Sequence, residues 1–155
     1  ARVAQDVAVK PTDTVLHIGT GSGFMAALLG KQAKSVLSLE INPALAAVAK
    51  ANLQRAGITN VDVRCADATA QGFKACEGQA PYDVIVLSGS VAEVPSALLH
   101  MLKVGGRLSA IVGNEPMMRA TLITRASDTA FTTEQPWDYL APRLKNFPQP
   151  SAFRF

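Results

Sequence analysis

Residues Asp13–Glu40 read DTVLHIGTGSGFMAALLGKQAKSVLSLE, and their pattern indicates the fold of the chain. An apolar run at residues 15–18 leads into a glycine-rich turn at residues 19–23, and a second apolar run at residues 36–39 ends on Glu40. An apolar helical segment separates the two runs, so this order predicts a strand, a turn, a helix and a second, parallel strand. Glycine lets the backbone turn sharply and approach a ligand closely, and the free N–H groups of the helix face the same space. The stretch therefore predicts a βαβ unit with a nucleotide site at its mouth.

The spacing of the glycines indicates which kind of nucleotide binds there. A dinucleotide turn reads G-x-G-x-x-G, which requires glycine at position 24, whereas this chain has Phe24 there and Gly23 one position earlier. The pattern G-x-G-x-G fits a ligand without a pyrophosphate. Glu40 follows the first glycine by about 20 residues, where its carboxylate would accept hydrogen bonds from both hydroxyls of a ribose. An NAD-dependent enzyme is the alternative, and Phe24 argues against it.

The rest of the chain alternates between strand-like and helical segments. Asn42 and Pro43 are typical of an N-cap and a first helical position, and Gly57 is expected to end that helix. The alternation predicts an α/β domain over residues 1–155, in which a mostly parallel, twisted sheet has helices on both faces and a C-terminal antiparallel hairpin. The buried stripe of the helix that starts at Pro43 is expected to be Leu45, Val48, Ala49, Asn52 and Leu53. The other expected elements are a helix from near Ser22 to Gly30, strands at 60–65, 82–87 and 107–112, a helix at 95–102 and a hairpin of 120–126 with 130–135.

The two ends of the chain differ from this pattern. Residues 1–10 are typical of part of a helix that stops before Pro11, and the sequence begins without methionine, so we expect a fragment or a trimmed chain. Residues 136–155 contain several prolines and are expected to form an extended tail. The aromatic residues expected to pack over the domain are Trp137, Tyr139, Phe147, Phe153 and Phe155.

Composition excludes several classes of protein. Charged residues are only 17% of the chain and hydrophobic residues 48%, which is typical of a globular domain. The net charge is +3, but Lys and Arg are scattered singly, so neither a nucleic-acid partner nor a membrane partner is expected. No segment resembles a signal peptide, and a cytoplasmic location is the expectation. Cys65 and Cys76 match no disulfide framework or metal site; we expect Cys65 in the core and Cys76 in a loop.

The residues around the glycine turn resemble a known family. The stretch VLHIGTGSGF resembles motif I of class I S-adenosylmethionine-dependent methyltransferases, and it is particularly similar to the protein-L-isoaspartate O-methyltransferase family. The resemblance extends over nearly the whole chain and implies a Rossmann-like methyltransferase fold, S-adenosyl-L-methionine as the cofactor, and methyl transfer to a carboxylate or another nucleophile. The other similar blocks are VDVRCADATAQGF, APYDVIVLSGS and VPSALLHMLKVGGRLSAIVG.

The resemblance also implies roles for individual residues. Asp67 is expected to contact the adenine amino group, as the acidic residue after the third strand does in the family. Ser88 and Ser90 are expected on the acceptor side, although they could instead cap the following helix. His17 stands where the family usually has an acidic residue, and both a contact with the cofactor's amino acid part and a packed, structural role are open. The candidate cofactor-binding residues are His17, Gly19, Thr20, Gly21, Ser22, Gly23, Glu40, Ile41, Asp67 and Ala68.

The methyl acceptor is less well defined by the sequence. A protein or peptide carboxylate is the acceptor that the resemblance implies, and such an acceptor needs no strong base and no metal. The family binds its peptide through an N-terminal segment and a hydroxyl-bearing loop before motif I, and this chain starts after both. We therefore expect inefficient methylation of isoaspartyl peptides. The alternative is a methyltransferase-fold module that serves as a binding or regulatory partner.

Overall fold

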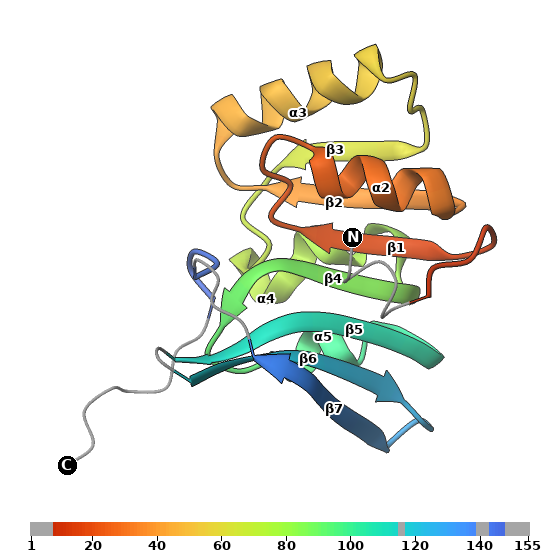
Figure 1. Ribbon diagram of the computed structural model, residues 1–155, viewed down its shortest axis with the longest axis vertical. Coiled ribbons are helices and arrows are strands. Elements are labelled where there is room, and N and C mark those ends of the chain that lie inside the picture. Colours follow the sequence, from red (N-terminus) through yellow and green to blue (C-terminus); the bar gives the residue numbers. More distant parts are fainter. Residues whose placement is uncertain (1–7, 115–116, 139–142, 148–155) are drawn as a thin grey trace.

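The computed structural model describes residues 8–114, 117–138 and 143–147, and these form a single seven-stranded sheet with helices on both faces (Figure 1). The strand order is β3-β2-β1-β4-β5-β6-β7. The first five strands are parallel, and β6 and β7 add an antiparallel hairpin at one edge. The predicted mostly parallel sheet with a C-terminal antiparallel hairpin is therefore confirmed. The strands are β1 Thr14–Ile18, β2 Ser35–Glu40, β3 Val61–Cys65, β4 Tyr82–Val91, β5 Leu102–Asn114, β6 Met117–Arg125 and β7 Phe131–Asp138.

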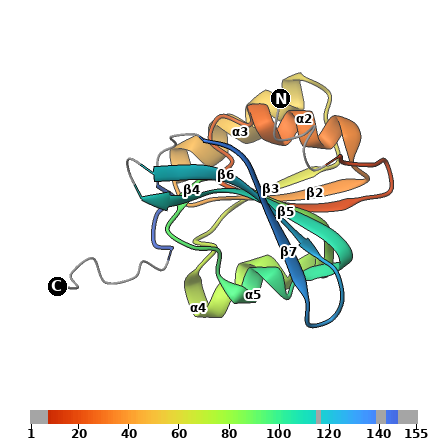
Figure 2. The same cartoon turned by 60° about the horizontal axis from the view of Figure 1, so that its bottom comes forward.

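The helices cover the two faces unequally. The longer helices α2 (Phe24–Gln32) and α3 (Pro43–Arg55) lie on one face, and the short helices α4 (Ala70–Phe73) and α5 (Ser96–Leu99) lie on the other (Figure 2). A 3-10 helix, η1 (Lys74–Gln79), continues from α4. Both faces of the central strands are therefore covered, which explains why their sequences are almost entirely apolar.

The central strand β1 shows how alternation builds two cores. Val15 packs toward α2 with Val36 of β2, whereas Leu16 packs on the opposite face with Leu37 and Ile85. These side chains are all at most 1% exposed. The register aligns Leu16 with both Leu37 and Ile85, so β1 is fixed between its two neighbours. The carboxyl end of β1 is thereby held at the same edge as the ends of β2 and β4.

The glycine turn after β1 has the backbone that its sequence predicts. Gly19, Gly21 and Gly23 have φ angles of 93°, 56° and 96°, in the left-handed region that disfavours residues with a Cβ. A Cβ on Gly23 would also lie 3.3 Å from the backbone of Ala49 in α3. The helix begins at Phe24, two residues later than expected, because Gly23 serves as its N-cap.

Several expected boundaries are wrong. Strand β4 continues through Val91, so Ser88 and Ser90 lie within the strand and do not cap a helix. Strand β5 begins at Leu102, five residues before the start expected at 107, and ends at Asn114. The short elements α4 and η1 were not expected from the sequence, and the helix expected over 95–102 has only the four residues of α5.

The ends of the chain can be compared only in part. Residues 136–138, expected in the extended tail, belong to β7. The partial helix expected at 1–10 lies outside the described residues except for residues 8–10, which are not helical. The side chains of Trp137, Tyr139, Phe153 and Phe155 also lie outside the described residues.

One prediction about burial is only partly confirmed, and a second is wrong. The buried stripe of α3 consists of Ala46, Ala49 and Leu53, whereas Leu45 and Val48 are 40% and 46% exposed. The cysteines exchange their expected places: Cys65 is exposed because it ends the edge strand β3, and Cys76 is buried by the packing of η1.

The described residues lack two kinds of feature. None of their helices has the length and apolar character needed to cross a bilayer. They contain no group of three or more His, Cys, Asp or Glu side chains that could hold a metal ion.

Candidate functional site

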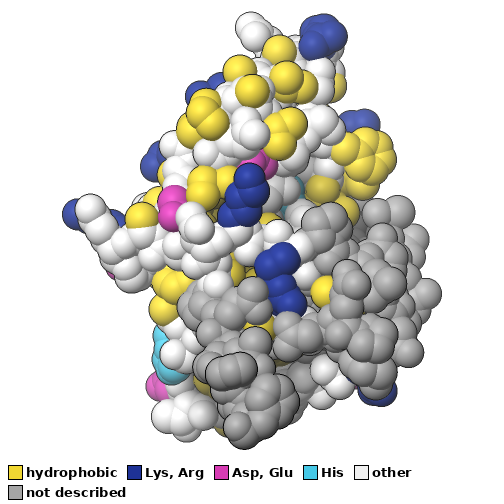
Figure 3. Space-filling view, turned by 90° about the vertical axis from the view of Figure 1, so that its left-hand side faces the viewer, with side chains coloured by type: hydrophobic (Ala, Val, Ile, Leu, Met, Phe, Trp, Pro, Cys, Tyr) yellow, Lys and Arg dark blue, Asp and Glu magenta, His cyan; other side chains and the backbone are white. Residues whose placement is uncertain are grey.

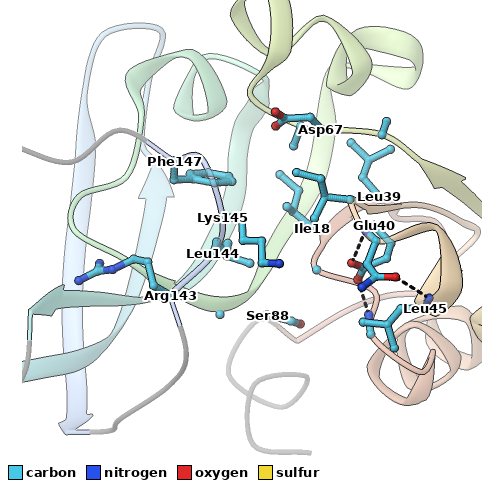
Figure 4. A pocket seen from close by; sticks show the side chains of 17 residues that line it. Ile18, Leu39, Glu40, Leu45, Asp67, Ser88, Arg143, Leu144, Lys145 and Phe147 are labelled. Atoms are coloured by element: carbon cyan, nitrogen blue, oxygen red, sulfur yellow. Dashed lines mark hydrogen bonds between the residues drawn. The ribbon is translucent and has the colours of Figure 1, made fainter.

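A pocket of about 390 Å³ lies at the carboxyl ends of β1, β2, β3 and β4, where open α/β sheets bind their ligands (Figure 4). This volume is within the usual range for small-molecule sites. Figure 3 views the molecule from the side to which these strand ends point, and basic, acidic and hydrophobic side chains lie close together near its centre. The pocket is therefore mixed in chemistry, which suits a ligand with both polar and flat apolar parts.

Glu40 closes one side of the pocket and is only 7% exposed. Its Oε1 accepts a hydrogen bond from the backbone N–H of Gly21 at 2.8 Å, and its Oε2 accepts one from the N–H of Asn42 at 3.0 Å. The carboxylate therefore joins the glycine turn to the start of α3. Each carboxylate oxygen has two acceptor positions, so one position on each oxygen remains for a ligand. Both oxygens can thus still accept bonds from ribose hydroxyls.

Asp67 lies in the loop after β3 and forms another part of the pocket wall. Its Oδ1 accepts hydrogen bonds from the N–H and the hydroxyl of Thr69 at 2.9 and 2.7 Å. The bond from the Thr69 hydroxyl is the main reason that the pKa of Asp67 is lowered, and a bond from Asn146 lowers it further. Asp67 is therefore charged at neutral pH. Its small neighbours Ala66 and Ala68 also line the pocket and leave room for a flat ring.

Residues 143–147, which we call the closing segment, form the wall opposite the strand ends (Figure 4). The N–H of Leu144 donates to the carbonyl of Ser90 at 2.8 Å, and the side-chain amide of Asn146 donates to Oδ2 of Asp67 at 3.0 Å. Phe147 is 7% exposed and packs edge-on against Phe73, with 5.7 Å between ring centroids. The segment is thus attached to the domain at three points. Its pocket-lining members are Arg143, Leu144, Lys145 and Phe147.

His17 is fully buried in β1 and does not line the pocket. Its Nδ1 is 2.9 Å from the Ser38 hydroxyl, and its Nε2 is 2.5 Å from the Ser88 hydroxyl. Burial lowers the pKa of His17 from 6.5 to about 4, because a charged ring would lose its hydration. The imidazole is therefore neutral at pH 7. Of the two roles open from the sequence, the packed role agrees with this geometry.

The structure brings together most of the predicted site residues and separates the others. The pocket is lined by Gly19, Gly21, Glu40, Ile41, Asp67, Ala68 and Ser88. Ser22 and Gly23 instead border a separate hollow against α3, because the turn directs them away from the strand ends. Thr20 is buried and bonded to Ser38, and Ser90 is covered because the closing segment pairs with β4 there. The structure therefore places His17, Thr20, Ser22, Gly23 and Ser90 outside the lining of this pocket.

Other pocket residues were missed by the sequence reasoning. Some immediately precede or follow predicted residues and could have been found from that position alone. The closing segment had no local signal, because its place in the wall depends on contacts with residues far away in the chain. The missed neighbours are Ile18, Leu39, Asn42, Ala66 and Gly89, and Leu45, one turn into α3, was missed as well.

Comparison with known families shows to which family the chain belongs. The family model described as Protein-L-isoaspartate(D-aspartate) O-methyltransferase (PCMT) matches residues 1–139. The chain belongs to the protein-L-isoaspartate O-methyltransferase family. It is 44% identical over 132 residues to protein-L-isoaspartate O-methyltransferase 2 of Marinobacter nauticus, covering 84% of this chain and 58% of that protein. It is 45% identical over 120 residues to the protein-L-isoaspartate O-methyltransferase of Methanospirillum hungatei, covering 77% of this chain and 54% of that protein.

The protein-L-isoaspartate O-methyltransferase fold is also found among solved structures. One structure with that name has a TM-score of 0.75 at 26% identity, covering 92% of this chain and 45% of its own. A second, a putative family member from Plasmodium falciparum in complex with S-adenosyl-L-homocysteine, has a TM-score of 0.74 at 21% identity, covering 93% and 70%. The chain thus spans little more than half the length of the curated family members it matches. The closing segment lies beyond the matched residues 1–139, although it forms part of the pocket.

Proposed function

We propose that this protein is an S-adenosylmethionine-dependent protein-L-isoaspartate O-methyltransferase that transfers a methyl group to a carboxylate of a protein or peptide. The observation that carries the proposal is the placement of Glu40 and Asp67 in one pocket, at the ends of two neighbouring parallel strands, next to the glycine turn. The names of the relatives support it, as does the S-adenosyl-L-homocysteine bound to the Plasmodium falciparum protein.

The pocket residues fit S-adenosylmethionine. Glu40 retains an acceptor position on each oxygen for ribose hydroxyls, and Asp67 retains one on Oδ2 for an adenine amino group. The apolar side chains of Ile18, Leu39 and Phe147 also line the pocket and can cover a flat base. When bound, the cofactor supplies a sulfonium methyl group that a nucleophile displaces.

The chain's own contribution to the reaction is orientation. A carboxylate acceptor is already ionised at neutral pH, so no protein base has to remove a proton from it. Among the described lining residues, Ser88 offers a hydroxyl, while the histidine nearest to the pocket, His17, is buried and bonded to two hydroxyls. Holding two reactants in line can account for much of a rate enhancement in such a displacement.

The test is a methylation assay with labelled S-adenosylmethionine, an isoaspartyl peptide and the same peptide with normal aspartate. We expect base-labile label in the isoaspartyl peptide only, and an authentic isoaspartyl enzyme run beside it tests whether turnover is low, as the sequence predicts. Asp67→Ala should raise the KM for the cofactor. The matched control Asp62→Ala changes an exposed carboxylate of β3 that does not line this pocket and should have no effect.

Label in neither peptide would contradict the proposal. If the cofactor still bound under those conditions, the alternative of a binding or regulatory module would be favoured instead.

A further inference from the structure

A line of four hydrogen-bonded side chains runs from the core of the sheet to the pocket, and we call it the polar relay. It consists of Thr20, Ser38, His17 and Ser88, with contacts of 2.6, 2.9 and 2.5 Å in that order. Thr20 is 3% exposed, and Ser38 and His17 are not exposed at all. Ser88 alone is exposed, and it lines the pocket. The relay therefore connects a buried polar cluster to the site.

The hydrogens of the relay can be counted. Each of the three hydroxyls has one hydrogen, and a neutral imidazole has one on either Nδ1 or Nε2. Each of the three contacts uses one hydrogen, so one of the four hydrogens is left without a partner inside the relay. The imidazole hydrogen is always used, because both ring nitrogens are in contacts, and the remaining hydrogen belongs to Thr20, Ser38 or Ser88.

Burial decides among these three arrangements. A remaining hydrogen on Thr20 or Ser38 would lie in the core, and neither side chain has a further hydrogen-bond partner among the described residues. A buried donor without an acceptor is costly. A remaining hydrogen on Ser88 lies in the pocket, where water or a ligand can accept it. The bonds therefore run outward: Thr20 donates to Ser38, Ser38 to Nδ1 of His17, and Nε2–H of His17 to Ser88.

We propose that His17 is a positioning residue, which holds the Ser88 hydroxyl as a hydrogen-bond donor to a carboxylate oxygen of the bound reactants. The proposal deepens the proposed function and rests on it. Lys145 lines the same pocket as Glu40 and Asp67, and its side chain points into it in Figure 4, so the pocket also holds a positive charge that can attract a negative group of a reactant. Two reactants have such a group: the acceptor, and the amino acid part of the cofactor.

The first experiment determines the direction of the hydrogen bonds in the polar relay, and it does not depend on enzymatic activity. Long-range ¹H–¹⁵N correlation of the ¹⁵N-histidine-labelled protein at neutral pH should show His17 with its proton on Nε2 and an unprotonated Nδ1. The only other histidine is the exposed His100, and its signals are assigned with His100→Gln. A proton on Nδ1 of His17 would overturn the proposal, whatever the fate of the proposed function.

The second experiment identifies the carboxylate with Ser88→Ala. Ser90→Ala is the matched control, because Ser90 lies in the same strand and its buried hydroxyl has no hydrogen-bond partner among the residues that the structure describes. Binding of S-adenosylhomocysteine is compared with binding of 5′-methylthioadenosine, which lacks the amino acid part. If the variant binds S-adenosylhomocysteine about 10- to 100-fold more weakly and binds 5′-methylthioadenosine unchanged, Ser88 donates to the carboxylate of the cofactor. If both ligands bind unchanged and the KM for the acceptor rises by a similar factor, Ser88 donates to the carboxylate of the acceptor. No change in either quantity would overturn the proposal.

The third measurement separates positioning from a merely structural role of His17. His17→Gln retains an amide donor for Ser88, and His17→Leu does not. We expect the same ligand effect as Ser88→Ala in the leucine variant, with recovery in the glutamine variant, at matched melting temperatures. Equal ligand binding and equal KM in both variants would refute the role of His17. Should the leucine variant not fold, Ser88→Ala and the tautomer still decide the question.

Discussion

Burial of His17 should make the protein less stable in mild acid. The folded-state pKa of His17 is lowered to about 4 from 6.5, and a lowered pKa means that the unfolded chain takes up a proton more readily than the folded one. Above pH 6.5 both states are neutral at this residue, so it contributes no pH dependence. Between pH 6.5 and about 4 the unfolded state gains the proton first, and stability falls as the pH falls.

The size of this effect follows from the pKa difference. The pKa of His17 is 6.5 in the unfolded chain and about 4 in the folded one. At about 1.36 kcal/mol per pKa unit, the free energy of unfolding should be about 3 kcal/mol lower at pH 4 than at pH 7. The assay is urea unfolding at pH 7, 6, 5 and 4, comparing the protein with His17→Gln, which has no ring to protonate. The difference in unfolding free energy between the two should change by about 3 kcal/mol over this range. A difference that is constant with pH would refute the reasoning. His100→Gln, at an exposed position, is the control and should leave the slope unchanged.

Three further predictions concern the pocket and its surroundings. Glu40→Ala should weaken S-adenosylhomocysteine binding by about 1.5–3 kcal/mol in calorimetric titration, because hydrogen bonds to a charged group are lost, and unchanged affinity would remove Glu40 from the site. Phe147→Ala should lower the unfolding free energy by about 1–3 kcal/mol in urea, less than a central core phenylalanine, because the closing segment can detach locally; an unchanged midpoint would mean that Phe147 does not anchor the segment. A thiol reagent at pH 8 should modify the exposed Cys65 and spare Cys76, because burial raises the pKa of Cys76 to about 12. Modification of Cys76 before Cys65, detected by mass spectrometry, would contradict this packing.

The parts of the fold that were predictable are those with local causes. The strand, turn, helix and strand of residues 13–40 follow from apolar periodicity and from three glycines that each adopt a positive φ. Glu40 and Asp67 could be placed in the pocket because parallel strands end at one edge of a sheet, so residues that follow two such strands meet.

The parts that were not predictable depend on contacts between distant residues. The pairing of the closing segment with Ser90 and Asp67 covers Ser90 and completes the pocket, and no spacing in the tail indicates either contact. The exposure of Cys65 follows from the position of β3 at the edge of the sheet, which depends on the strand order. The role of His17 depends on Ser38 and Ser88, which come from strands on both sides of β1. The cytoplasmic location stays a prediction from the sequence.

A calorimetric titration of this chain with S-adenosylhomocysteine, with NAD titrated in parallel, measures directly which nucleotide the pocket binds. The pocket described above, with its G-x-G-x-G turn, Glu40 and Asp67, predicts saturable binding of S-adenosylhomocysteine at one site per chain and no binding of NAD. Asp67→Ala should weaken the first titration, and Asp62→Ala should leave it unchanged. Absence of S-adenosylhomocysteine binding by the folded protein, or binding of NAD with equal affinity, would contradict the account.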